Sequence, residues 1–306
     1  MTKQTNKGWI GAVMASALFL AIAAMGSCGS DDPASPDPGG QDTIVQGDTT
    51  MIIDHACCDI SLIPRQAIQD AIDALVIAYG HTSHGNQLIQ GMNYLADFLG
   101  DDLYNHSLDG AGNTLELRDK AMPGDLGNPN WTQWEVETRS YLAGHPEVNV
   151  IIWSWCGEVS YATEENIDTY LSLMNGLEND YPEVSFVYMT GHLDGQPPGY
   201  TIHLRNQQIR DYCVANDKIL YDFADIESYD PDGSYYADKR ADDACNYDSD
   251  GDAYRESNWA LDWQAAHPGE WYECDPDHTQ HLNGNLKAYA AWWLWARLGG
   301  WDGTPE

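Results

Sequence analysis

Short continuous apolar runs alternate along the chain with longer stretches of helical periodicity. The runs lie at 74–79, 148–155, 184–190 and 219–223, and a more charged run at 115–122 is a further strand candidate. Continuous apolar runs are typical of parallel strands buried on both faces. The amphipathic stretches between them predict helices at 87–99, 131–142, 164–177, 204–215 and 285–298. This alternation predicts an α/β domain with a doubly wound, mainly parallel sheet flanked by helices.

The first residues carry the pattern of an export signal. Lys3 and Lys7 precede an apolar run at 9–25, which ends in small residues and Cys28. The pattern resembles a bacterial lipoprotein signal peptide, with Cys28 as the lipidated first residue of the mature protein. The alternative is a single membrane-spanning anchor, for which the run is barely long enough.

The segment that follows is rich in Pro, Gly, Ser and Asp, a composition that cannot bury a core. We therefore expect a signal peptide at 1–28, a disordered linker at 29–49 and one folded domain at 50–306. The expected location is outside the cytoplasm, as a membrane-anchored lipoprotein at the outer membrane or cell surface. A formal charge of −34 argues against binding nucleic acid or anionic headgroups through surface charge.

Polar stretches follow three of the predicted strands. Residues 80–85 read Gly-His-Thr-Ser-His-Gly, residues 156–158 read Cys-Gly-Glu, and residues 191–194 read Gly-His-Leu-Asp. In doubly wound sheets, ligands bind at the carboxyl ends of the strands. These stretches are therefore expected to converge on one edge.

A serine and a distant Asp-x-x-His pair suggest nucleophilic catalysis. Ser83 lies where the first predicted strand passes into a helix, so its hydroxyl can project at the sheet edge. Asp275 lies three residues before His278, just ahead of the last predicted helix. A carboxylate there can orient an imidazole that takes the proton of the serine.

These motifs resemble those of the SGNH hydrolases, also called GDSL-type esterases, over roughly residues 75–298. The resemblance implies a flavodoxin-like fold, a nucleophilic Ser83, and Asp275 with His278 as the orienting pair. It also implies an oxyanion hole built from the Ser83 amide and Gly127. It predicts an esterase that needs no cofactor for catalysis. The expected surface location of the protein and its many aromatic residues suggest acyl groups on carbohydrate, or another small ester, as substrate.

The chain departs from the family motifs at two places. The Gly-Asp-Ser of the family is replaced by the longer Gly80-His81-Thr82-Ser83, and Cys156-Gly157 stand where an asparagine is expected. Gly157 is a further pocket candidate. Cys156 is expected to be a buried apolar residue or half of a disulfide with Cys213, since a nucleophilic thiol is disfavoured in an oxidising compartment.

The histidines leave alternatives open. His281 competes with His278 as the base, whereas His81, His84 and His192 are expected to line the pocket or to make hydrogen bonds there. A second hypothesis is a zinc-dependent hydrolase that uses His81, His84, His192 and either His278 or His281. A third is a glycan-binding lipoprotein on a degenerate hydrolase fold, which would bind its ligand without turnover.

An acidic, loop-rich insertion at 230–274 precedes the last motif, and we expect it to form a wall of the pocket. Asp248, Asp250 and Asp252 alternate around a glycine, a pattern that suits a structural Ca²⁺, although no EF-hand is formed. A solvated acidic loop is the alternative. Cys245 and Cys274 flank much of the insertion, and we expect a disulfide between them.

Overall fold

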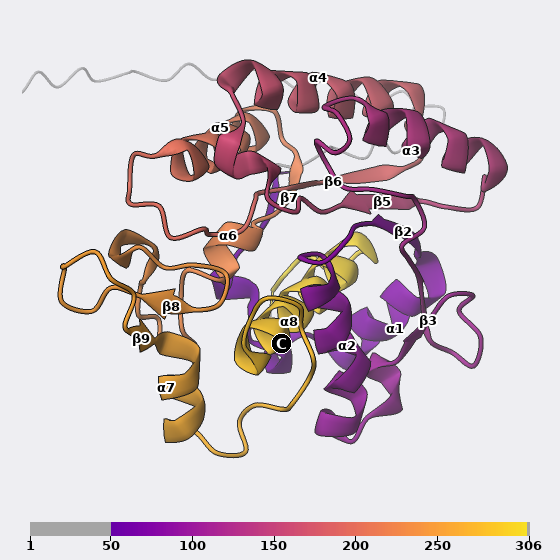
Figure 1. Ribbon diagram of the computed structural model, residues 1–306. Coiled ribbons are helices and arrows are strands. Elements are labelled where there is room, and N and C mark those ends of the chain that lie inside the picture. Colours follow the sequence, from indigo (N-terminus) through magenta and orange to yellow (C-terminus); the bar gives the residue numbers. More distant parts are fainter. Residues whose placement is uncertain (1–49, 305–306) are drawn as a thin grey trace, which may run out of the picture. The chain divides into compact units, whose positions relative to one another are not determined.

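The computed structural model describes residues 50–304, which lie within one compact unit. The expected signal peptide, linker and lipidation site fall outside the described residues. A seven-stranded sheet, parallel throughout, forms the centre of this unit (Figure 1). Its strands are β1 Met51–Ile53, β2 Val76–Gly80, β3 His106–Ser107, β4 Leu115–Asp119, β5 Val150–Trp153, β6 Ser185–Met189 and β7 Ile219–Tyr221.

The strand order makes the sheet doubly wound. The strands lie in the order β1-β7-β6-β5-β2-β4-β3. The five central strands, numbered by their order in the chain, therefore follow the flavodoxin-like order 2-1-3-4-5. The chain leaves β2 toward β4 and then returns to the other side of β2 to form β5. The switch point lies between β2 and β5, and ligands bind at such points in doubly wound sheets.

Helices cover both faces of the sheet. Figure 1 shows α3, α4 and α5 on one face and α1, α2 and α8 on the other. The helices are α1 Arg65–Ala74, α2 Asn86–Leu99, α3 Gln133–Gly144, α4 Glu164–Asp180, α5 Thr201–Ala215, α6 Phe223–Ile226, α7 Trp259–Ala266 and α8 His281–Leu298. Short 3-10 helices lie at η1 His55–Cys57, η2 Ile60–Leu62, η3 Asp102–Tyr104, η4 Glu158–Tyr161 and η5 Ala237–Lys239.

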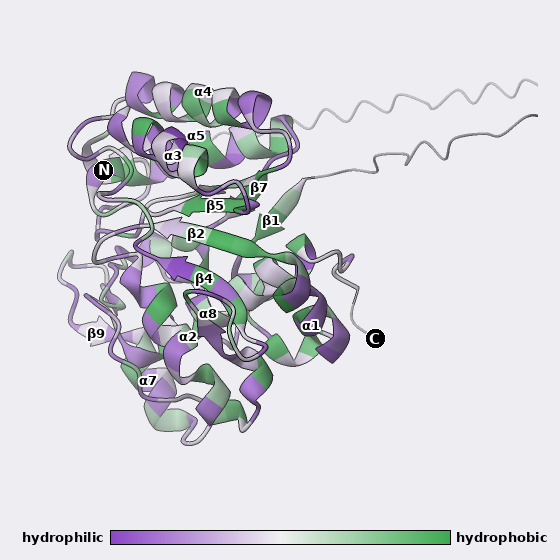
Figure 2. Ribbon diagram, turned by 90° about the vertical axis from the view of Figure 1, so that its right-hand side faces the viewer, coloured by the Kyte–Doolittle hydropathy of each residue, from purple (hydrophilic) through white to green (hydrophobic). Residues whose placement is uncertain are grey.

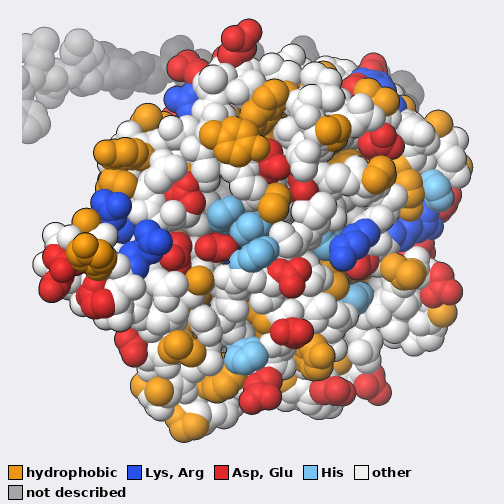
Figure 3. Space-filling view, in the orientation of Figure 1, with side chains coloured by type: hydrophobic (Ala, Val, Ile, Leu, Met, Phe, Trp, Pro, Cys, Tyr) orange, Lys and Arg blue, Asp and Glu red, His pale blue; other side chains and the backbone are white. Residues whose placement is uncertain are grey.

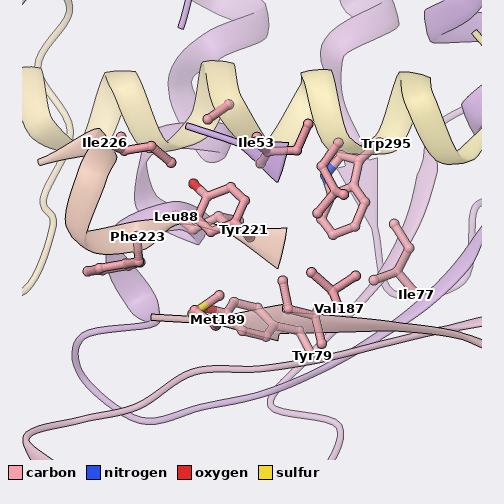
Figure 4. Close-up of a cluster of buried hydrophobic side chains, with 14 of the residues drawn as sticks. Ile53, Ile77, Tyr79, Leu88, Val187, Met189, Tyr221, Phe223, Ile226 and Trp295 are labelled. Atoms are coloured by element: carbon pink, nitrogen blue, oxygen red, sulfur yellow. The ribbon is translucent and has the colours of Figure 1, made fainter. Parts of the chain in front are cut away.

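The core covers both faces of the sheet, and a large part of it lies between the sheet and α8, where the strands are continuously apolar (Figures 2 and 4). Ile77 and Val187 of the strands and Trp295 of α8 are at most 1% exposed. Gly91 of α2 lets that helix approach α8 closely, because a Cβ at this position would stand 2.0 Å from the Gly284 carbonyl oxygen. None of the described helices is long and apolar enough to span a membrane.

The predicted α/β class and the parallel sheet are confirmed. The charged run at 115–122 forms β4 at one side of β2, where three of the five strand residues stay partly exposed. The last helix begins at His281 rather than at 285, and Asn283 and Gly284 are buried within its first turn. The insertion carries α7 and a small antiparallel pair, β8 Asn246–Tyr247 and β9 Ser257–Asn258.

Candidate functional site

The loops that follow β2, β4 and β5 are tied together at the switch point. Asp125, in the loop after β4, accepts hydrogen bonds from the Thr82 amide at 2.7 Å and from the Thr82 hydroxyl at 2.6 Å. Leu126 in the same loop pairs with Trp155 after β5. The sequence segments that carry Ser83 and Cys156 therefore meet at one edge of the sheet, as their positions after the strands predicted.

A thiol, an imidazole and a carboxylate form a continuous set of contacts at this edge. The Cys156 Sγ lies 3.3 Å from Nδ1 of His84, and the His84 Nε2 lies 3.0 Å from Oδ2 of Asp243. The Ser83 Oγ lies 3.5 Å from the Cys156 Sγ. An ionised carboxylate only accepts hydrogen bonds, so Nε2 of His84 carries the proton and Nδ1 presents its lone pair to the thiol.

The surroundings of this set favour a neutral imidazole and an ionised carboxylate. Burial lowers the pKa of His84, and the neighbouring His192 adds to this effect, against the hydrogen bond to Asp243. Burial acts to raise the pKa of Asp243, but the hydrogen bond from His84 and the nearby cations outweigh it, so that pKa is lowered. An imidazole that stays neutral is able to take up a proton from the thiol.

Three histidines stack at this site. The His84 ring lies 3.8 Å from the His192 ring at an interplanar angle of 5°, and 4.6 Å from the His278 ring at 20°. Figure 3 shows histidine side chains, in pale blue, gathered near the centre of this face with acidic side chains beside them. The stack therefore brings together side chains from the turn before α2, the loop after β6 and the loop before α8.

Backbone amides at the start of α2 are available to an anion. Among residues 50–304, no hydrogen-bond acceptor engages the amides of Ser83 and His84. The Cys156 amide instead donates to Oε2 of Glu158 at 2.9 Å. Burial raises the pKa of Glu158, against hydrogen bonds from nearby amides. The free amides near the hydroxyl and the thiol have the character of an oxyanion hole.

A buried lysine connects two of the loops that carry these histidines. Lys287 of α8 is 0% exposed, and its Nζ lies 2.7 Å from Oε2 of Glu227, which is also 0% exposed. The same Nζ donates to Oε1 of Gln87 and lies 3.7 Å from the centre of the Phe223 ring. Glu227 and Gln87 in turn bind the backbone of the loops that carry His192 and His278.

Glu227 accepts a hydrogen bond from the Leu193 amide, next to His192. Gln87 donates at 2.8 Å to the carbonyl of Asp277, next to His278. One buried charge therefore helps to hold the backbone on both sides of the histidine stack.

The expected Asp275 and His278 pair is placed differently from a triad. Both side chains are exposed, and His278 has a positive φ of 67°. Within the described part of the chain, neither side chain makes a hydrogen bond or an ion pair. His278 reaches the site by stacking on His84, whereas Asp275 does not join it.

Two other histidines that the sequence suggested for the site make their contacts away from the histidine stack. The His281 Nδ1 faces the backbone of Cys274, and its ring stacks on Trp271. The His81 side chain is fully buried, with Nε2 2.5 Å from Oδ1 of Asp119. The zinc ligand set predicted from the sequence is therefore only partly assembled.

The two candidate glycines lie near the site in different settings. Gly127 has a φ of +83°, and a Cβ there would stand 3.0 Å from the Glu158 side chain, so the position requires glycine. A Cβ at Gly157 would meet nothing within 4 Å. Gly127 therefore packs against the loop that carries Cys156, whereas Gly157 faces open space.

The described cysteines do not form the disulfides that were expected from the sequence. Cys245 and Cys274 are both buried free thiols, and the other described cysteines are free thiols as well. Cys245 Sγ lies 3.4 Å from the Thr279 hydroxyl, while Cys274 Sγ lies 3.5 Å from the His281 carbonyl oxygen. Each thiol faces a different part of the loop before α8, so the expected disulfide is not formed in this structure. Cys156, which faces His84, is not paired with Cys213 either.

The acidic loop brings four carboxylates together. Oxygen atoms of Asp248, Asp250, Asp252 and Glu256 all lie within 4.8 Å of one another. Asp248 accepts hydrogen bonds from the amides of Gly251 and Ala253, which shape the loop. The sequence pattern had lacked a glutamate at the twelfth position, and Glu256 supplies one from the ninth. The donor set is compatible with Ca²⁺.

A cavity of about 550 Å³ lies apart from this edge of the sheet. Its lining includes His55, Tyr229, Trp263 and Tyr289, and it shares no residue with the set of Cys156, His84 and Asp243. We therefore place the candidate site at the switch point because of the chemistry of its side chains, and not because of the size of a cavity.

Sequence reasoning missed Asp243 and the network below it. Nothing in the composition of the insertion distinguishes Asp243 from its acidic neighbours, because only the tertiary fold brings it to His84. Lys287 read as one position of an amphipathic helix. Cys156 was recognised as following a strand, but its contact with His84 was not predicted.

No protein-family model, curated protein or solved structure matches the chain.

Proposed function

We propose that the protein is an acyl hydrolase that cleaves small esters, with Cys156 as nucleophile, His84 as base and Asp243 as the group that orients the base. The observation that carries the proposal is the contact of Cys156 Sγ with His84 Nδ1, while the His84 Nε2 contacts Asp243. A nucleophile in contact with a base that a third group orients is the geometric signature of covalent catalysis.

The steps follow from this geometry. The thiol proton passes to Nδ1 of His84, and Sγ of Cys156 attacks the ester carbonyl. The amides of Ser83 and His84 hold the oxyanion, and the carbon–oxygen bond then breaks as the leaving alkoxide takes the proton from Nδ1. Water, deprotonated by His84, hydrolyses the thioester, which releases the acid and restores the thiol.

Ser83 is the second candidate nucleophile, in a serine esterase of SGNH type. Two observations favour it: the hydroxyl lies 3.5 Å from Cys156 Sγ, and the His278 ring belongs to the same stack. In that mechanism His278 takes the serine proton and Asp275 orients it. The hydroxyl contacts no imidazole in this structure, whereas the thiol does, so we prefer Cys156.

For the substrate class and the cellular location, our proposals are those predicted from the sequence. We propose a small-molecule or carbohydrate ester as substrate, because the expected cell-surface location and the many aromatic residues of the chain suit acyl groups on carbohydrate. We also propose an exported protein that is anchored to the membrane through Cys28. No cofactor takes part in the thiol mechanism.

The test compares single variants of the full chain in the hydrolysis of p-nitrophenyl acetate. We expect Cys156→Ala to reduce kcat/KM by about 1,000-fold or more, as removal of a nucleophile does. Cys57→Ala, at a partly exposed cysteine outside the site, is the matched control and should keep normal activity. Alkylation with iodoacetamide and peptide mapping should then show Cys156 as the fastest-reacting thiol.

The same experiment separates the alternatives. Loss of turnover in Ser83→Ala with full activity in Cys156→Ala, together with fluorophosphonate labelling of Ser83, would replace the thiol with the serine. A folded wild-type protein that binds polysaccharide but turns over no ester would support the glycan-binding hypothesis instead.

A further inference from the structure

Three metal-ligating side chains converge at the edge of the sheet. One donor atom each from His84, His192 and Asp243 lies within 4.8 Å of the other two. The residues come from the start of α2, from the loop after β6 and from the acidic insertion. Two imidazoles with one carboxylate form a donor set that suits zinc and related divalent ions.

The ring nitrogens are oriented for such a role. Nδ1 of His192 lies 2.7 Å from the Leu193 carbonyl oxygen, so it carries the proton and leaves the Nε2 lone pair free. The amide of Leu193 is held by buried Glu227, which is paired with Lys287. This second layer of contacts anchors the loop that presents His192, as outer partners do in metal sites.

The arrangement requires a small adjustment to accept an ion. The rings of His84 and His192 are nearly parallel in the stack, so they must splay for both Nε2 lone pairs to reach one point. The Cys156 thiol contacts the opposite nitrogen of His84, Nδ1, and so stays on the far side of the ring. Three protein ligands leave a fourth position of a tetrahedral ion open.

We propose that a divalent ion of the zinc class binds to His84, His192 and Asp243, and that its binding switches off the thiol mechanism. The inference of a switch rests on the proposed function, whereas the metal site does not. An ion that binds Nε2 of His84 displaces the proton that Nε2 donates to Asp243. The neutral ring then carries its proton on Nδ1. Nδ1 then has no lone pair for the thiol proton, so the metal-bound and base-competent states exclude each other.

The first measurement is binding of Zn²⁺ to the metal-free full chain, followed by competition with a chromophoric chelator. We expect one tightly bound ion. In His192→Gln the affinity for zinc should fall by about 100-fold or more, because loss of a ligand should cost at least as much as loss of a residue that hydrogen-bonds to a ligand. His145→Gln, at a histidine that bonds the Tyr141 carbonyl and stacks on its ring, is the matched control and should bind as the wild type does.

The second measurement is the rate at which iodoacetamide alkylates Cys156. At a zinc concentration of about ten times its Kd, about a tenth of the sites stay empty, so alkylation should slow about tenfold. In His192→Gln the same zinc concentration should leave the rate unchanged. Circular dichroism of each variant confirms that it is folded.

Three results would overturn the proposal. The first is that folded wild-type protein binds no zinc. The second is that His192→Gln binds zinc normally, which would place the ion on the thiol, the acidic loop or another cluster. The third is that zinc-loaded protein hydrolyses ester while metal-free protein does not, since the ion would then be catalytic. If zinc binds as expected but neither metal-free nor zinc-loaded protein hydrolyses an ester, only the proposed function fails.

Discussion

Replacement of Lys287 by methionine tests whether the buried charge stabilises the fold beneath the site. The Nζ of Lys287 and the carboxylate of Glu227 are both fully buried, 2.7 Å apart. Methionine fills similar space but leaves the Glu227 carboxylate without its counter-charge. Breaking a buried ion pair by removing one partner costs about 3–5 kcal/mol of unfolding free energy. We expect a loss in this range.

The assay is equilibrium urea unfolding of the full chain, with the change read from the midpoint at constant slope. Lys218→Met is the matched control, because Lys218 and its partner Glu178 are 15% and 24% exposed. A partly exposed pair should contribute at most about 1 kcal/mol. The comparison therefore isolates the effect of complete burial.

A double variant adds a sharper criterion. Glu227→Gln in the Lys287→Met background removes the unpaired charge, while the amide oxygen of glutamine still accepts from Leu193. It should recover roughly half of the lost stability, since a neutral unpaired group costs about 1–3 kcal/mol. A loss below about 1 kcal/mol in Lys287→Met alone would refute the reasoning.

Three further predictions concern packing, the acidic loop and the thiols. Gly91→Ala should destabilise the protein by about 1–3 kcal/mol, because its Cβ would clash with the Gly284 carbonyl, whereas Gly176→Ala in open space on α4 should stabilise it by about 1 kcal/mol. Equal effects of the two alanines in urea unfolding would contradict the close contact of α2 and α8. If Ca²⁺ binds the loop, a concentration of about 100 times its Kd adds about 2.7 kcal/mol to stability. Melting with and without a chelator measures this, and Asp250→Asn should abolish the difference while exposed Asp238→Asn keeps it. Alkylation in denaturant without prior reduction, followed by peptide mapping, should find Cys245 and Cys274 both modified, and an unmodified disulfide-linked peptide would restore the pairing expected from the sequence.

The class of fold, and the edge of the sheet at which the polar strand ends meet, follow from the amino-acid sequence alone. Continuous apolar runs specify strands buried on both faces, because no side of such a strand can face water. With helices between them, right-handed crossovers leave a parallel sheet with its polar strand ends on one edge. Ser83, Cys156 and His192 were therefore expected together, and the structure places them near one another around His84.

Which side chains touch at that edge depends on the packing of distant segments and could not be predicted. Asp243 comes from a loop-rich insertion whose acidic residues look alike in sequence, and long-range packing alone selects the one that meets His84. The Asp-x-x-His spacing likewise did not bring Asp275 to His278, because local spacing sets neither the direction of a side chain nor its burial. Lys287 shows the same limit, since its charge lies in the core only because Glu227 and Gln87 meet it there.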